Sequence, residues 1–236
     1  MKKVIFVFLG FFLLHVAAIA QINTLTPQEQ KQGWILLFNG KNLDGWTSVG
    51  KDAPPTSGWE IKDGLLTVKK EGDKGGGDII TKGQFSDFEL LVDFRITEGA
   101  NSGIKYFFVR YEKGGWLGLE YQILDDEKHP DAKLGRDGNR LQAGLYDMFA
   151  PKGKKDSPVG EWNQARIVAK GTKVTHYLNG KKVLSFDRKS KEYRKTYELS
   201  KFNQSVPMFG DVKQGHILLQ DHGDVVSFRN IKIKTL

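Results

Sequence analysis

The chain has 236 residues, a formal net charge of +8 at pH 7 and no cysteine. The lack of cysteine excludes a disulfide-stapled scaffold, thiol catalysis and thiolate metal sites. A hydrophobic content of 39% and an aromatic content of 11% exclude disorder as the main state, so the protein must be held together by a hydrophobic core.

The first twenty residues have the pattern of a secretory signal peptide. Lys2 and Lys3 precede an apolar run over 4–14, and residues 18–20 (Ala-Ile-Ala) resemble a cleavage site. The run is too short to span a bilayer comfortably, and no later segment reaches the length of a membrane helix. We therefore expect an exported protein, periplasmic or secreted, whose mature chain starts at Gln21 and has no membrane anchor.

The basic residues are dispersed along the chain. Their densest run spans 188–195, where only Tyr193 and Tyr197 lie among or beside the charges. A nucleic-acid site would need basic side chains clustered on one face with aromatic rings between them for base stacking. We therefore expect a solvated basic surface and no nucleic-acid partner.

Alternating apolar and polar residues predict short strands throughout the mature chain. A hairpin with an Asp63-Gly64 turn is predicted over 58–68. Further strands are predicted over 85–96, 102–109, 117–124, 162–169, 174–178, 183–186, 216–220 and 225–233. The best helix signal is Thr26 as N-cap with Pro27 at the first position. Ten or more strands predict a single domain, residues 21–236, with an all-β fold: a two-sheet antiparallel sandwich.

The most informative polar residues are Glu120 and Gln122, because a strand would place both on one face and Tyr121 on the other. A solvated outer face is an equally ordinary explanation of such a pair. Trp116 and Tyr111 nevertheless bring large rings near the same sheet, and a polar strand face flanked by aromatic residues is typical of a sugar site.

Gln220 and His222 form a second polar pair near the end of a predicted strand. A lone histidine at a strand end is more often structural than catalytic. His129 and His176 are weaker candidates, since His129 lies in an acidic loop and His176 alternates onto the solvent side of its strand. The acidic loop over 125–131 is rich in oxygen ligands, but its spacing matches no known Ca²⁺ loop, so a solvated loop is the better expectation.

Six motifs carry a family resemblance: GWILLFNGKNLDGW (33–46), NSGI (101–104), EYQILD (120–125), GLYD (144–147), EWN (161–163) and ILLQDHGDVVSFRNIKIK (217–234). In this order they resemble the 3-keto-disaccharide hydrolase family, long known as domain of unknown function 1080, over essentially the whole mature chain. Lys105 departs from the pattern, because many members carry an aromatic or aliphatic residue after NSGI. This departure indicates a subgroup.

The resemblance implies a concanavalin-like jelly roll with a carbohydrate-binding sheet, and cleavage of glycosides whose glucose carries a ketone at C3. A separate oxidoreductase would supply the ketone, because this chain has no dinucleotide-binding motif. The ketone acidifies the C2 proton, so a base can form an enolate that expels the C1 oxygen, and added water gives net hydrolysis. This route needs a base, a group that stabilises the enolate and a proton for the leaving group.

For this chemistry we expect His222 or Glu120 as the base and Lys105 as the cationic group facing the enolate. No cofactor is required, although a divalent cation could replace Lys105 as the electrophile. The remaining residues expected to bind the sugar are Gln122, Asp125, Asn101, Tyr146, Trp116 and Gln220.

Two other functions fit the same residues. A non-catalytic carbohydrate-binding module would use the same aromatic and amide face, with His222 purely structural. A two-carboxylate glycosidase would need a second acid, and the sequence has Gln122 at that position.

Overall fold

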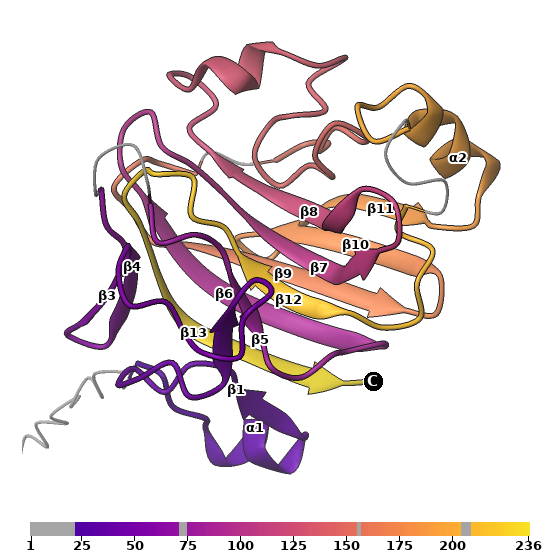
Figure 1. Cartoon of the computed structure of the whole chain (residues 1–236). Helices are drawn as coiled ribbons and strands as arrows, with labels where there is room; N and C mark the ends of the chain where they lie inside the picture. The colour runs from indigo at the N-terminus through magenta and orange to yellow at the C-terminus, as the bar shows by residue number, and fades with distance from the viewer. Residues whose placement is uncertain (1–21, 71–74, 155–156, 204–208) are drawn as a thin grey trace, which may run out of the picture.

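The computed structural model describes residues 22–70, 75–154, 157–203 and 209–236, so the predicted signal peptide over 1–20 lies outside the described residues. Two antiparallel sheets pack face to face as a jelly-roll-type sandwich (Figure 1). The predicted all-β, two-sheet architecture is confirmed. In the described part of the chain, no helix has the length and apolar character needed to cross a membrane.

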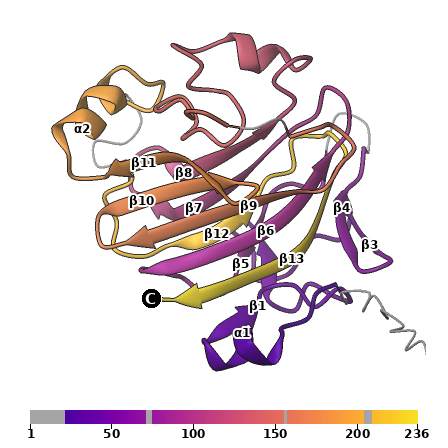
Figure 2. The same ribbon diagram turned by 180° about the vertical axis from the view of Figure 1, so that it is seen from behind.

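The larger sheet has the strand order β11-β10-β9-β6-β13-β4-β3, and β1 pairs with β13 (Figure 2). Its strands are β1 (Trp34–Leu36), β3 (Trp59–Lys62), β4 (Leu65–Val68), β6 (Phe88–Ile96), β9 (Asn163–Lys170), β10 (Lys173–Leu178), β11 (Lys181–Asp187) and β13 (Val226–Thr235). The smaller sheet has the order β2-β5-β12-β7-β8. Its strands are β2 (Trp46–Ser48), β5 (Ile79–Thr81), β7 (Asn101–Tyr111), β8 (Gly115–Leu124) and β12 (His216–Leu219).

The core lies between the two sheets and follows from the period-2 pattern. Along β6 every second residue from Phe88 to Ile96 is buried, and along β8 Leu119, Tyr121 and Ile123 are fully buried. Because neighbouring side chains on a strand point to opposite faces, the same alternation leaves Glu120 and Gln122 on the outer face of the smaller sheet. The core pattern thus fixes the orientation of the predicted polar pair.

The described residues also form three short helices: α1 (Pro27–Lys31), a 3₁₀ helix (Pro130–Lys133) and α2 (Lys191–Glu198). The first has the predicted Thr26 cap, whose hydroxyl accepts the Glu29 N–H. The second and third come from segments for which the sequence predicted no helix. Ser190 caps α2, and the buried face of this helix consists of Tyr193 and Tyr197 alone. An apolar face of two residues is too small to produce a recognisable helical period.

His176 corrects a prediction, because its ring is fully buried between the sheets rather than on the solvent side of β10. Its Nδ1 atom donates to the Ala143 carbonyl (3.0 Å), and its Nε2 atom accepts from the Tyr106 hydroxyl (2.8 Å). Burial lowers the pKa of His176 to about 4, against the opposing effect of the Ala143 carbonyl. The ring is therefore a neutral structural group.

This buried ring predicts a loss of stability in acid. Below the usual pKa of 6.5 the unfolded chain takes up a proton at His176, whereas the folded chain does so only near pH 4. The free energy of unfolding should therefore fall by about 3 kcal/mol between pH 7 and pH 4 from this group alone. Urea unfolding of the parent and of His176→Gln at both pH values measures it. An equal loss in both proteins would contradict the prediction.

Candidate functional site

A pocket of about 240 Å³ lies on the outer face of the smaller sheet and brings together seven of the predicted site residues. These are Asn101, Lys105, Glu120, Gln122, Tyr146, Gln220 and His222. The pocket is also lined by Asp131, which belongs to the acidic loop considered above, and by residues that the sequence did not single out: Leu117, Gly118, Lys201 and Phe202. Residues from β7, β8 and the end of β12 form its floor, and the loops after β8 and α2 form its walls.

The pairing register of β7 and β8 places Lys105 and Glu120 side by side on the pocket floor. Lys105 lies directly opposite Glu120, and Gly103 lies directly opposite Gln122. On the other side of β7 the Gln220 N–H donates to the Gly103 carbonyl (3.0 Å), which sets Gln220 beside the same patch. Three strands therefore converge at Gly103.

Gly103 is required here by the carboxylate of Glu120. A Cβ atom at this position would lie 2.4 Å from Glu120 Oε1, which is far inside van der Waals contact. The missing side chain leaves the space that the carboxylate occupies. The NSGI motif thus has a steric reason for its glycine.

Glu120 is a buried carboxylate in a charged environment. Its residue is 8% exposed, and the Lys105 Nζ atom lies 3.9 Å from Glu120 Oε2 and 3.8 Å from Asp78 Oδ2. Burial raises the pKa of Glu120 and Asp78 adds to the rise, while Lys105, Lys201 and His222 oppose it. A carboxyl group with a raised pKa is a stronger base than an exposed one, which suits it to proton transfer.

Two side-chain amides leave acceptors without partners. The Oε1 atoms of Gln122 and Gln220 are buried and accept no hydrogen bond within the described part of the chain. Gln122 Nε2 donates weakly to Asn101 Oδ1 (3.4 Å), which fixes the amide orientation. Buried acceptors usually have partners, so hydroxyl groups of a ligand are the natural donors for these oxygens.

The walls of the pocket come from loops that sequence reasoning did not place. Lys201 Nζ donates to the Tyr146 hydroxyl (3.2 Å) and lies 4.3 Å from the Tyr146 ring centroid. Arg140 binds both Asp131 (2.6 Å) and Asp147 (2.8 Å), and it thereby ties the wall segments together. Of these residues, Tyr146 alone was predicted to bind the sugar, and it belongs to the GLYD motif together with Asp147.

Two predicted ligand-binding residues lie elsewhere. Asp125 lies outside this pocket, and its carboxylate accepts the N–H groups of Gly99, Glu127 and Lys128, so it holds the loop rather than a hydroxyl. Trp116 stacks on Phe108 with ring centroids 5.6 Å apart and lines a separate hollow. The structure therefore does not bring these two predicted sugar-binding residues together with the other seven.

Three carboxylates of the acidic loop over 125–131 bind donors of the protein, and the loop is therefore not simply solvated. Asp126 accepts the Gln142 N–H (2.7 Å) and pairs with Lys154. Asp131 binds Arg140, as described above. Protein donors therefore occupy these carboxylates.

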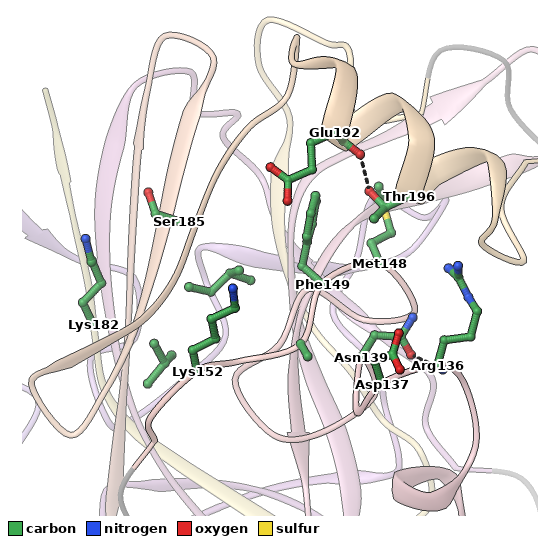
Figure 3. A pocket seen from close by; sticks show the side chains of 13 residues that line it. Arg136, Asp137, Asn139, Met148, Phe149, Lys152, Lys182, Ser185, Glu192 and Thr196 are labelled. Carbon is green, nitrogen blue, oxygen red and sulfur yellow. Dashed lines mark hydrogen bonds between the residues drawn. The ribbon is translucent and has the colours of Figure 1, made fainter.

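A larger hollow of about 420 Å³ lies between the 136–152 segment, β11 and α2 (Figure 3). Figure 3 shows Phe149 within it, and the charged groups of Lys152, Lys182 and Glu192 around it. These three residues and Asp137 are exposed, and Arg136 is partly buried. The Thr196 hydroxyl donates a hydrogen bond to the Glu192 carbonyl (3.0 Å). No buried ionisable group converges there among the described residues, so the sheet pocket is the candidate functional site.

Residues 33–234 match the family model of the 3-keto-alpha-glucoside-1,2-lyase-like domain. The chain belongs to this family. A 3-keto-disaccharide hydrolase of Bacteroides thetaiotaomicron is 39% identical over 92% of this chain and 83% of its own length. The family resemblance predicted from the ordered motifs is confirmed.

Two solved structures from Parabacteroides distasonis, both provisionally described as glycosyl hydrolases, share this family fold. The first has a TM-score of 0.79 and 31% identity, with 92% of this chain and 100% of that chain covered. The second has a TM-score of 0.64 and 28% identity, with 86% and 99% covered. The sandwich seen here is thus a fold already observed in experimentally solved proteins.

Proposed function

We propose that this protein cleaves 3-keto glycosides, with Glu120 as the base that removes the C2 proton. Its assignment as a glycoside-cleaving enzyme follows from family membership and from the relative named 3-keto-disaccharide hydrolase. The observation that carries the residue assignment is the buried Glu120 carboxylate, paired with Lys105 and flanked by two amide oxygens that have no partner among the described residues. We further propose that residues 1–20 direct export of the enzyme to the periplasm or the medium.

Side chains of the pocket account for each proton transfer in the proposed reaction. Glu120 takes H2, and the C2–H electrons form an enolate across C2, C3 and the ketone oxygen, near the positive charge of Lys105. The enolate returns to the ketone, a C1–C2 double bond forms, and the C1–O bond breaks. Lys201 and Tyr146, joined by their hydrogen bond, supply the leaving oxygen with a proton. Addition of water across the double bond, with OH at C1 and H at C2, gives net hydrolysis.

Glu120 is preferred to His222 as the base because of their different surroundings. Glu120 lies on the pocket floor, where burial raises its pKa and hydroxyl-binding amides surround it. His222 is exposed, on the segment that follows β12. A base in a dry site next to a fixed cation has both the basicity and the electrostatic stabilisation that enolate formation needs.

The decisive experiment compares an aryl glucoside with its 3-keto derivative. The mature protein should release the aryl alcohol from the 3-keto compound and leave the unoxidised glucoside intact. Equal release from both compounds would contradict elimination through a C3 ketone. Binding of the 3-keto compound without release would instead favour a carbohydrate-binding module, for which the amide-lined pocket is equally suited.

A further inference from the structure

We propose that His129, His222 and Asp224 form a binding site for a divalent transition-metal ion at the edge of the substrate pocket. One ring nitrogen from each histidine and one carboxylate oxygen of Asp224 lie within 4.8 Å of one another. His129 immediately precedes the 3₁₀ helix, and the other two residues lie between β12 and β13. Side chains distant in the sequence are thus brought to one point by the fold.

The protein holds two of these ligands in place. Asp224 Oδ2 accepts the Asn101 N–H (2.9 Å), which fixes the carboxylate and leaves its second oxygen for a metal. Asp221 accepts the N–H groups of Gly77 and Gly223 (3.0 Å each), which shapes the turn that carries His222. The two imidazole rings lie 6.0 Å apart between centroids, at 83° to each other.

The ligand types select the class of ion. Two imidazole nitrogens and one carboxylate suit divalent transition-metal ions, Zn²⁺ as a borderline ion and Mn²⁺ as a harder one, whereas Ca²⁺ prefers oxygen ligands throughout. Three protein ligands leave coordination positions open for water or for substrate oxygens. The three residues therefore predict a metal site with coordination positions that a substrate can occupy.

Metal binding through Nε2 of His129 would break one hydrogen bond of this ring. His129 Nδ1 accepts the Asp131 N–H at 3.2 Å, which is a long hydrogen bond. A ring that binds a metal through Nε2 carries its proton on Nδ1, so Nδ1 could no longer accept the Asp131 N–H and this hydrogen bond would be lost. Asp131 also lines the substrate pocket, so this loss would link metal binding to the pocket wall.

The position of the site gives it a role if the proposed function holds. His222 and Asn101 both line the substrate pocket, so an ion on His222 would face a bound sugar. The ketone or a neighbouring hydroxyl of a 3-keto sugar could then occupy an open position, beside the positive charge of Lys105.

The test is a binding experiment that does not depend on activity. The mature protein, freed of metal with a chelator, is titrated with Zn²⁺, Mn²⁺ and Ca²⁺ by calorimetry. We expect one equivalent of Zn²⁺ or Mn²⁺ to bind, with at least tenfold weaker binding of Ca²⁺. His129→Ala and Asp224→Asn should each weaken binding of the transition ion by at least tenfold. His216→Ala serves as the control, because this histidine instead binds the Thr81 carbonyl and the Gln84 side chain.

A second measurement on the parent protein covers the case in which a variant fails to fold. Zn²⁺ should shift the ring-proton NMR signals of His129 and His222 and leave those of His176 and His216 unchanged. No saturable binding, or binding that His129→Ala and Asp224→Asn both leave intact, would overturn the site. If the metal binds but a chelator does not slow release from the 3-keto compound, the site stands and the proposed reaction proceeds without the ion.

Discussion

Replacing Glu120 by glutamine should lower kcat for 3-keto glycosides by roughly 10²–10⁴-fold, the usual contribution of a positioned general base. The substitution keeps the shape of the side chain and removes its ability to accept the C2 proton. The dissociation constant for the substrate should change by only a few-fold, because the amides of Gln122 and Gln220 remain. Steady-state kinetics and calorimetry on the same substrate separate the two effects.

The pH profile provides an independent readout of this role. The base must be deprotonated, so kcat/KM of the parent should fall as the pH drops through a Glu120 pKa that burial raises above 4.5. The residual activity of Glu120→Gln should lack this acid limb. Glu60→Gln, an exposed change on β3, is the matched control and should leave both rate and profile unchanged. Full turnover in Glu120→Gln would return the role of base to His222.

The glutamine should not destabilise the fold. Burial raises the pKa of Glu120, because the loss of hydration destabilises its charge by more than Lys105 and Lys201 stabilise it. A neutral amide avoids that cost, and Lys105 keeps its second partner, Asp78 (3.8 Å). A melting temperature equal to or above that of the parent is therefore expected.

The sequence predicted the floor of the pocket because strand geometry is regular. Glu120 and Gln122 are two residues apart, so a strand must place them on one face, opposite the buried Tyr121. Their orientation depends only on local alternation. Prediction of the convergence with Lys105 and Gln220 relied on the family motifs, because strand pairing between distant segments is not visible in a residue pattern.

The walls of the pocket were less predictable. Lys201 reaches Tyr146 from the turn after α2. The sequence offers no signal that this turn lies over the pocket on the smaller sheet. Trp116 was predicted to bind the sugar on the same sheet as Glu120, but four strand residues span about 13 Å, and Trp116 lines a separate hollow. His176 was predicted on the solvent side because a buried, hydrogen-bonded histidine has the same pattern as an exposed one.

Replacing Gly103 by alanine should reduce kcat/KM at least tenfold with only a small change in melting temperature. The new methyl group would lie 2.4 Å from Glu120 Oε1, and 3.0 Å from its Cδ and Cγ atoms. The side chain of Glu120 can rotate away from this contact, so the backbone keeps its pairing while the carboxylate leaves its catalytic position. Gly45→Ala is the control, because its nearest neighbour, the Leu37 carbonyl oxygen, would be 3.7 Å away.

A double-mutant cycle tests whether Gly103 acts through that carboxylate. If its only function is to leave space for the Glu120 base, Gly103→Ala should cost almost nothing further in a protein that already carries Glu120→Gln. Additive losses would contradict this reading. They would assign the effect of Gly103 instead to its backbone carbonyl, which accepts the Gln220 N–H (3.0 Å) and holds the second unpartnered amide over the pocket.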